Sequence, residues 1–354
     1  MVYNSNKINR EQLFELAGIT GKTYTPATVG RKNKMTKPMK IWADQFCDLN
    51  FRNVNELRAI QPENVTAMPL FTQENGQYIP VSNEYKAIVG NETKETYAIH
   101  SGKYEVVQHS VITDAMAMAC EDTSLSVFGH FDEEKGKFNG YGSFANPDVH
   151  IDLFEEKDDP VMLGMRFFNS HNGDSRFGGE IFGLRMVCGN YMAWGDLLGK
   201  VSIRHFKSEQ NVTEELGKIL RGFVDKMDAL KDRVHYIRDT KVEISEQTAL
   251  LWGIGLQPKQ IGSIMTYREY LNPEIKPESV SVFDIYNAST AYVSYRVGGA
   301  HMVDGNLRMS DRIEKLLTSD VDKLIDSGNV RMNKYLEEEG AEEQTSQVKL
   351  EVYA

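Results

Sequence analysis

Apolar and polar residues alternate along two runs near the middle of the chain, residues 161–168 and 180–187. Alternation with a period of two is typical of half-buried strands. A polar, glycine-rich connection over residues 169–179 joins the runs and contains Asn172-Gly173, a favoured tight-turn pair. We predict an antiparallel hairpin centred on this pair, in which the numbers of directly paired residues sum to an odd value.

This register predicts one apolar sheet face, and alternation assigns Phe167 and Phe182 to the core. The other face then carries two arginines and two glycines, namely Arg166, Arg185, Gly164 and Gly183. We infer that an extended ligand can lie close to this face, where arginines flank bare backbone. The alternative is that the arginines only make the outer face of the sheet soluble.

The hairpin lies within a longer series of expected elements. They are a helix at 9–16, a loop or arm at 20–39, a helix at 41–46, turns and edge strands over 53–96, a strand at 104–107, a helix at 111–121, strands at 124–131, 137–144 and 149–153, and a short helix at 191–198. Later helices are expected near 245–252, 258–271, 280–295 and 309–325. The sequence therefore predicts an α+β fold, with an antiparallel sheet of hairpins packed by helices and a largely helical C-terminal part.

A heptad seam begins after residue 206. Its members are Leu216, Leu220, Phe223, Met227, Leu230, Val234 and Ile237, which recur at alternating spacings of four and three on one predicted helix. The seam can pair with another chain or pack on the protein's own sheet, and its short length favours self-packing.

These patterns divide the chain into four parts: an N-terminal helix and basic arm at 1–45, an α+β core at 46–206, a helical region at 207–330 and an acidic flexible tail at 331–354. The arm holds six basic residues between Lys22 and Lys40 and no acidic one. Either charged segment can be a solvated terminus, but the arm also permits contact with a polyanion and the tail with a protein partner.

Composition excludes several classes of protein. The net charge of -11 argues against a generally basic nucleic-acid binder. We find no long apolar run, so we expect neither a membrane span nor a secretion signal. The distant cysteines Cys47, Cys120 and Cys188 fit buried thiols in a reducing cytoplasm.

Motifs for cofactor chemistry are absent from the sequence. There is no Gly-x-x-x-x-Gly-Lys-Ser/Thr loop, no dinucleotide fingerprint and no histidine or cysteine cluster with metal-ligand spacing. We therefore expect no cofactor, no metal and no catalytic residue. A Cys188 nucleophile with a His171 base is conceivable, but a buried inert thiol explains Cys188 better. A metal-dependent hydrolase would use Asp174 and Glu180 with His171, a nonspecific set.

Basic and aromatic residues are interleaved around the hairpin and the strand that follows it. Cations that track phosphates and aromatic faces that stack on bases bind single-stranded nucleic acid in this combination. The candidate contacts are Arg166, Asn169, His171, Arg176, Arg185, Lys200, Arg204 and His205, with Phe168, Phe177 and Tyr191 as stacking residues.

The segment from Asn169 to Met192 resembles the central signature of a phage- and plasmid-like family, domain of unknown function 932. The resemblance rests on an Asn-Ser-His-x-Gly run, a strand ending in Arg-x-Val-Cys-x-Asn and the basic strand at 202–205. Further matches lie at 104–108 and 283–290, so it covers roughly residues 35 to 320. Members are typically encoded on phages and plasmids, which implies a role in mobile-element biology.

These observations predict an ATP-independent single-stranded DNA-binding protein that assists recombination, annealing or replication of a phage or plasmid. The predicted order of elements is also similar to the core of ring-forming single-strand annealing proteins, a likeness of fold alone. We expect a homo-oligomer in the cytoplasm, that of the host cell if a phage encodes the protein. The alternatives are a structural or host-interaction protein, in which C-terminal helices cover the Arg166 face, and a metal-dependent nuclease.

Overall fold

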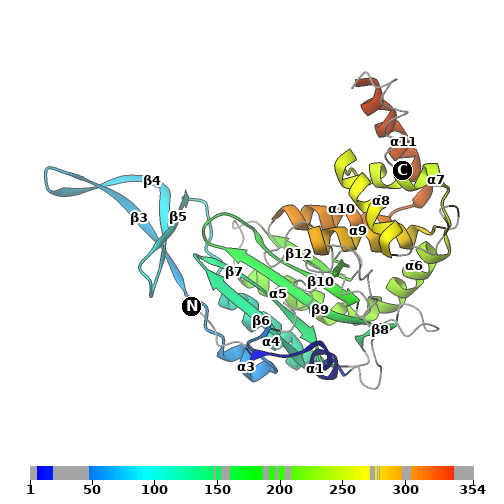
Figure 1. Cartoon of the computed structure of the whole chain (residues 1–354). Coiled ribbons are helices and arrows are strands. Elements are labelled where there is room, and N and C mark those ends of the chain that lie inside the picture. The colour runs from blue at the N-terminus through cyan, green and yellow to red at the C-terminus, as the bar shows by residue number, and fades with distance from the viewer. Residues whose placement is uncertain are drawn as a thin grey trace.

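The computed structural model describes residues 6–18, 48–146, 149–152, 160–185, 191–195, 198–203, 209–271, 276, 278, 280–296 and 304–338. Within them the chain forms a mixed α+β fold, with antiparallel sheets followed by helices in the C-terminal part (Figure 1). The predicted fold class is therefore confirmed. The predicted arm at 20–39 and helix at 41–46 lie outside the described residues.

A central antiparallel sheet organises the body of the molecule. Its described strands are β6 (Val127–Glu134), β7 (Lys137–Phe144), β8 (Ile151–Asp152), β9 (Pro160–Ser170), β10 (Phe177–Arg185), β11 (Tyr191–Ala193) and β12 (Lys200–Ile203). The order is β11-β10-β9-β7-β6, with β12 also beside β10 and β8 beside β9. β9 is the central strand, and all its residues except Phe168 are buried.

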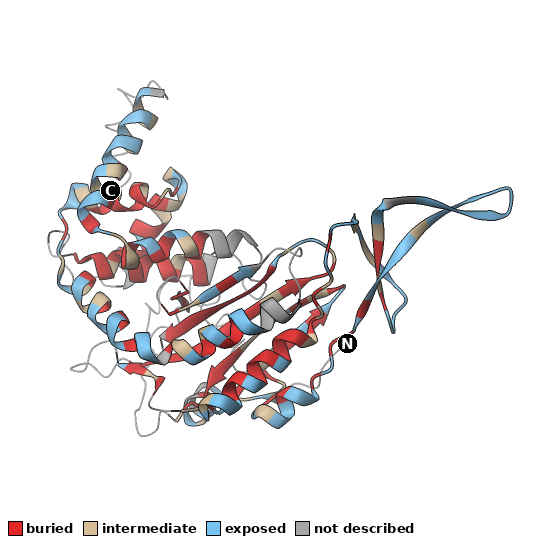
Figure 2. Cartoon of the chain, turned by 180° about the vertical axis from the view of Figure 1, so that it is seen from behind, coloured by how far each residue is buried: buried red, intermediate tan, exposed pale blue. Residues whose placement is uncertain are grey.

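One face of the sheet is covered by α4 (Ser110–Thr123) and α5 (Glu209–Gly222), whose buried sides face the strands in Figure 2. Close approach of α4 depends on Gly142, where a Cβ would lie 1.9 Å from Cε of Met116. Beside it, the rings of Phe144 and Phe223 stack with centroids 4.9 Å apart. Burial of such aromatic surface contributes more than area alone, because stacked pairs add roughly 0.5–1.5 kcal/mol.

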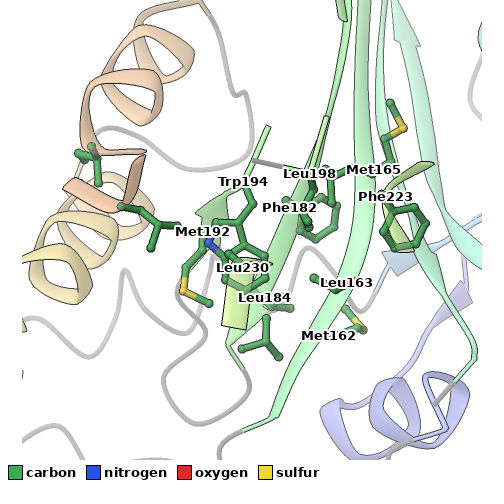
Figure 3. Close-up of a cluster of buried hydrophobic side chains, with 14 of the residues drawn as sticks. Met162, Leu163, Met165, Phe182, Leu184, Met192, Trp194, Leu198, Phe223 and Leu230 are labelled. Carbon is green, nitrogen blue, oxygen red and sulfur yellow. The ribbon is translucent and has the colours of Figure 1, made fainter. Parts of the chain in front are cut away.

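The C-terminal part is helical and meets the sheet at β11. It contains the 3-10 turn η2 (Val224–Lys226), α6 (Met227–Asp239), α7 (Ile244–Gly253), α8 (Pro258–Leu271), α9 (Val282–Arg296), α10 (Asp304–Thr318) and α11 (Val321–Glu338). Figure 3 shows Met192 of β11 and Trp194, which follows that strand, in one cluster with Phe182 of β10 and Leu230 of α6. The buried Trp194 Nε1 donates to the hydroxyl of Tyr286 on α9 at 3.1 Å, so the indole is satisfied inside the core.

The heptad seam packs inside the protein. All seven of its residues are buried, which favours self-packing over a seam for another chain. The prediction that they lie on one helix is wrong, because the chain leaves α5 after Gly222, turns through η2 and starts again as α6. α11 continues to Glu338, inside the segment predicted as the acidic tail.

Three strands form a separate arm that projects from one end of the sheet (Figure 1). They are β3 (Val65–Glu74), β4 (Gln77–Gly90) and β5 (Thr96–Ser101), in the order β3-β4-β5. A small core of Val65, Ile88 and Tyr104 holds the base of the arm. The predicted strand at 104–107 is wrong, because these residues pair in no sheet and Tyr104 instead packs beneath the arm.

Short elements close the other end of the sheet: β1 (Asn6–Lys7), α1 (Arg10–Leu16), β2 (Asp48–Leu49) and α3 (Val54–Ala59). Asn9 caps α1 through a reciprocal capping box with Gln12, which confirms the predicted N-terminal helix. The helix predicted at 191–198 is wrong at its start, since Tyr191–Ala193 form β11. A short apolar run does not distinguish strand from helix by itself.

Candidate nucleic-acid interface

The register of the β9–β10 hairpin differs by one residue from the predicted one. Arg166 pairs with Glu180 and Val161 with Arg185, so paired numbers sum to an even value. The turn occupies residues 171–176 rather than centring on Asn172-Gly173. A shift of one residue moves every side chain of one strand to the other face. Positions 166 and 185 therefore lie on opposite faces, and the predicted two-arginine face is corrected.

Arg166 is a buried structural residue. Its Nη2 lies 2.6 Å from Oε1 of Glu180, and the two side chains are 6% and 5% exposed. Both project from the sheet face opposite α4 and α5, in adjacent strands. A charge taken out of water requires such a partner, because the isolated ion costs several kcal/mol. The prediction that Arg166 holds a nucleic-acid backbone is corrected, because its guanidinium is paired with the Glu180 carboxylate inside the protein.

Asn169 and His171 are also fully buried, so their predicted contact with a ligand is corrected. The Asn169 amide donates to the Val107 carbonyl at 2.8 Å and lies 3.0 Å from Nδ1 of His109. The rings of His109 and His171 pack with centroids 3.9 Å apart. The backbone N–H of His171 donates to the Gly136 carbonyl at 2.7 Å. These residues tie the β9–β10 turn to the start of α4 and to the β6–β7 turn.

The same buried residues of the β9–β10 turn also contact the arm formed by β3, β4 and β5. His100 of β5 lies 3.1 Å from the carbonyl of His171 and stacks on Tyr104 with centroids 4.0 Å apart. Glu133 of β6 accepts the backbone N–H of Glu63 at 3.0 Å. We call the buried set Glu63, Glu133, His109, Asn169 and His171 the joint, because it connects the arm to the central sheet.

Hydrogen bonds keep the carboxylate of Glu63 ionised. Burial raises the pKa of Glu63, but bonds from Tyr97, Thr93 and Glu92 outweigh it and lower that pKa overall. Burial, followed by the bond to Glu63, raises the pKa of Tyr97 to about 12. An ionised Glu63 therefore accepts from a protonated Tyr97 across the neutral pH range, which locks the start of β3 to the β4–β5 turn.

The remaining predicted contacts fall into three groups. Phe177 is fully buried, so its predicted stacking role is corrected. Phe168 is half-buried, and Arg176 and Lys200 are exposed. Arg204, His205 and the side chains of Arg185 and Tyr191 lie outside the described part of the structure.

Phe168 lies on an exposed part of the sheet face opposite α4 and α5. Its partner on β10 is Gly178, and a Cβ there would lie 2.2 Å from Cζ of Phe168, so the ring rests across bare backbone. The next residues in the same row are Asn139 on β7 and Ser202 on β12, both exposed. We call Phe168, Gly178, Asn139 and Ser202 the platform. Sequence alternation identifies Phe168, but only the register identifies the other three.

Charge is unevenly distributed around the platform. Lys200 is next to Ser202 along the same face of β12, and Arg176 immediately precedes β10. On the opposite side, Asp132 of β6 pairs with Asn139 and is exposed. Lys200 Nζ lies 3.4 Å from Asp311 of α10, an exposed pair that costs little to open. A polyanion therefore meets cations along the β10–β12 side and repulsion along β6.

The residues predicted for a metal-dependent hydrolase are not brought together. His171 is buried in the joint, Glu180 pairs with Arg166, and Asp174 is exposed and forms an ion pair with Lys137. Among the described residues, no group of three or more histidine, cysteine or acidic side chains is arranged to hold a metal ion. Cys188 lies outside them, whereas Cys120 is a buried free thiol.

The fold and site define an α+β protein with a helix-backed antiparallel sheet, a projecting β arm and a polar aromatic platform. Residues 97–266 match the model of a family described as a domain of unknown function, DUF932. The match runs from β5 through the central sheet into α8. Comparisons with curated proteins and with solved structures gave no match. No helix in the described ranges is long and apolar enough to cross a membrane.

Proposed function

We propose that the protein binds single-stranded DNA without ATP and assists recombination, annealing or replication of a phage or plasmid in the cytoplasm. The observation that carries the proposal is the Phe168 ring, which rests across Gly178 with polar, exposed neighbours on both sides. A half-buried aromatic on a polar sheet face gives a base a surface on which to stack.

The binding mode follows from the distribution of charge. A base stacks on Phe168, while the adjoining phosphates run past Arg176 and Lys200 on the β10–β12 side. Asn139 and Ser202 offer hydrogen bonds to phosphate or sugar oxygens, which carry no sequence information. Asp132 repels a strand that strays toward β6. The platform is short, so one copy holds only a few nucleotides.

Two variants separate stacking from charge in a fluorescence anisotropy titration of labelled oligo-dT across a salt series. Phe168→Ala is expected to weaken binding by about 1–3 kcal/mol, or roughly 5- to 150-fold, with an unchanged salt slope. Arg176→Ala/Lys200→Ala is expected to flatten the slope of log K against log salt by about 1.4, because each lost phosphate contact removes about 0.7.

Matched controls come from exposed residues away from the platform. Tyr236→Ala on α6, where the tyrosine is 45% exposed, controls for loss of an aromatic ring, and Lys218→Ala/Lys259→Ala controls for loss of two charges. Both controls should bind like wild type. Absence of wild-type binding at low salt, or equal losses in Phe168→Ala and Tyr236→Ala, would remove the proposal.

A second candidate is a structural or host-interaction protein. The burial of Arg166 and the contact of Lys200 with Asp311 on α10 favour it, because both withdraw cations from solvent. In that case the wild type binds no oligo-dT at low salt, and protein partners should be sought by pull-down. The acidic tail is the segment that we propose for such a partner.

A further inference from the structure

The arm formed by β3, β4 and β5 exposes large apolar side chains. Met68, Tyr85 and Ile99 at its base are 48%, 52% and 59% exposed, and Phe71 and Tyr78 toward its tip are 52% and 74% exposed. Figure 2 shows almost the whole outer arm as exposed, in contrast to the buried sheet beside it. Contiguous apolar surface of this kind marks an interaction site rather than an ordinary surface.

The register places the exposed residues on one face of the arm's base. Met68, Ala87 and Ile99 form one row across β3, β4 and β5, and Tyr85 lies two residues along β4 on the same side. The opposite face holds Ile88 and His100, which pack toward the small core and the joint. Ala87 itself is buried, and we call the exposed residues Met68, Tyr85 and Ile99 the bare face.

Beyond the base the arm is a two-stranded ribbon. β5 pairs only with Tyr85–Val89, so residues 70–84 have no third strand among the described residues. A two-stranded ribbon is marginal in water unless something packs against it. Pro69 of β3, at the base of the arm, and Pro80 of β4, in the ribbon, each remove a backbone donor, which disfavours the addition of a further strand at the edges. Side-chain packing is therefore the mode of contact to expect.

Charge decides which kind of partner fits. Residues 65–85 contain only two charged side chains, Glu74 and Glu84, although 26% of the chain is charged. Both are acidic, so a phosphate polyanion or an anionic lipid surface meets repulsion there. The bare face itself carries no charge. Two copies with a net charge of -11 each repel one another, and they can approach closely only where no acid faces an acid.

We propose that the bare face packs against the bare face of a second copy of this chain. An uncharged apolar face is complementary to itself, so a two-fold arrangement needs no separate receptor surface. The contact covers Met68, Tyr85 and Ile99 in both copies and steadies the two ribbons. This inference does not rest on the proposed function, since the platform lies on the central sheet and not on the arm.

Sedimentation velocity of the full chain over a range of concentrations tests the proposal. Wild type is expected to be dimeric or larger, and Met68→Lys/Ile99→Lys to be monomeric because lysines then oppose lysines across the two-fold. Met118→Lys/Val330→Lys is the matched control, since these apolar residues of α4 and α11 are 51% and 69% exposed. The control should sediment like wild type, and all three should melt at similar temperatures.

Three results would overturn the proposal. They are a wild type that stays monomeric at every concentration, an oligomer that survives Met68→Lys/Ile99→Lys, and a monomer that instead co-sediments with neutral phosphatidylcholine vesicles through the arm. None of these results changes the outcome expected for the oligo-dT titration of Phe168→Ala. Failure of this inference is therefore distinguishable from failure of the proposed function.

Discussion

The ion pair between Arg166 and Glu180 makes a quantitative prediction, because its two side chains are only 6% and 5% exposed and 2.6 Å apart. Arg166→Met keeps an unbranched apolar stem and removes the guanidinium, which leaves a buried carboxylate without this cation. Breaking a buried pair from one side costs about 3–5 kcal/mol, whereas replacing both partners by apolar residues is often nearly neutral. Arg166→Met should therefore lower the free energy of unfolding by about 3–5 kcal/mol.

Urea unfolding followed by circular dichroism measures the full cycle of wild type, Arg166→Met, Glu180→Leu and Arg166→Met/Glu180→Leu. We expect each single variant to unfold at a clearly lower urea concentration and the double variant to be more stable than either single one. A favourable coupling of about 2 kcal/mol or more is the signature of the pair. A loss below about 1 kcal/mol in Arg166→Met would place Arg166 at the surface and refute the burial argument.

Three further predictions follow from individual side chains. Burial raises the pKa of the Cys120 thiol to about 12, so in a Cys47→Ser/Cys188→Ser background it should react with a thiol reagent at pH 8 only after unfolding; rapid labelling of the native protein would contradict this. Burial lowers the pKa of His150 to about 4, below its unfolded value, so the unfolded chain binds the extra proton. Stability should therefore fall by up to roughly 3 kcal/mol as the pH drops from about 6.5 to about 4. The isosteric His150→Gln should lack this loss in urea unfolding, and parallel pH profiles would refute the assignment. Asp132→Asn should strengthen oligo-dT binding about two- to fivefold, by removing an exposed repulsive charge, and anisotropy showing no gain would place the strand elsewhere.

The sequence predicted the hairpin but not its register, and this difference decides the site. Phe167 and Phe182 are both buried, as alternation predicted, but the observed pairing places them on opposite faces of the sheet. Both are buried because β9 is covered on its two faces and not on one alone. The pairing depends on the length of the turn, which occupies 171–176. A one-residue difference there brings Glu180 beside Arg166 and makes a predicted ligand residue a structural one.

The role of the polar residues in the β9–β10 turn was also misjudged from sequence, for a physical reason. Asn169 and His171 have partners that are distant in the chain, Val107 and His109, and no local pattern identifies such long-range contacts. Polar residues in a loop are usually solvated, but a buried cluster satisfies them equally well when every group finds a partner. In the joint, the Asn169 amide finds such partners in the Val107 carbonyl and the His109 ring.

The sequence predicted turns and edge strands in the region of the β3–β5 arm. It could not predict which faces of these strands are exposed. Tyr78 and Ile79 are residue types typical of a half-buried strand, and sequence alone does not show that both are exposed. Whether a strand face is covered depends on the tertiary arrangement of the elements around it.

The most direct test of the account is the affinity of Phe168→Ala for labelled oligo-dT, compared with wild type and Tyr236→Ala at several salt concentrations. The account predicts a loss of roughly 5- to 150-fold for Phe168→Ala alone, with an unchanged salt slope and an unchanged melting temperature. Wild-type affinity in Phe168→Ala would contradict it, because the platform would then make no contact with the bound strand.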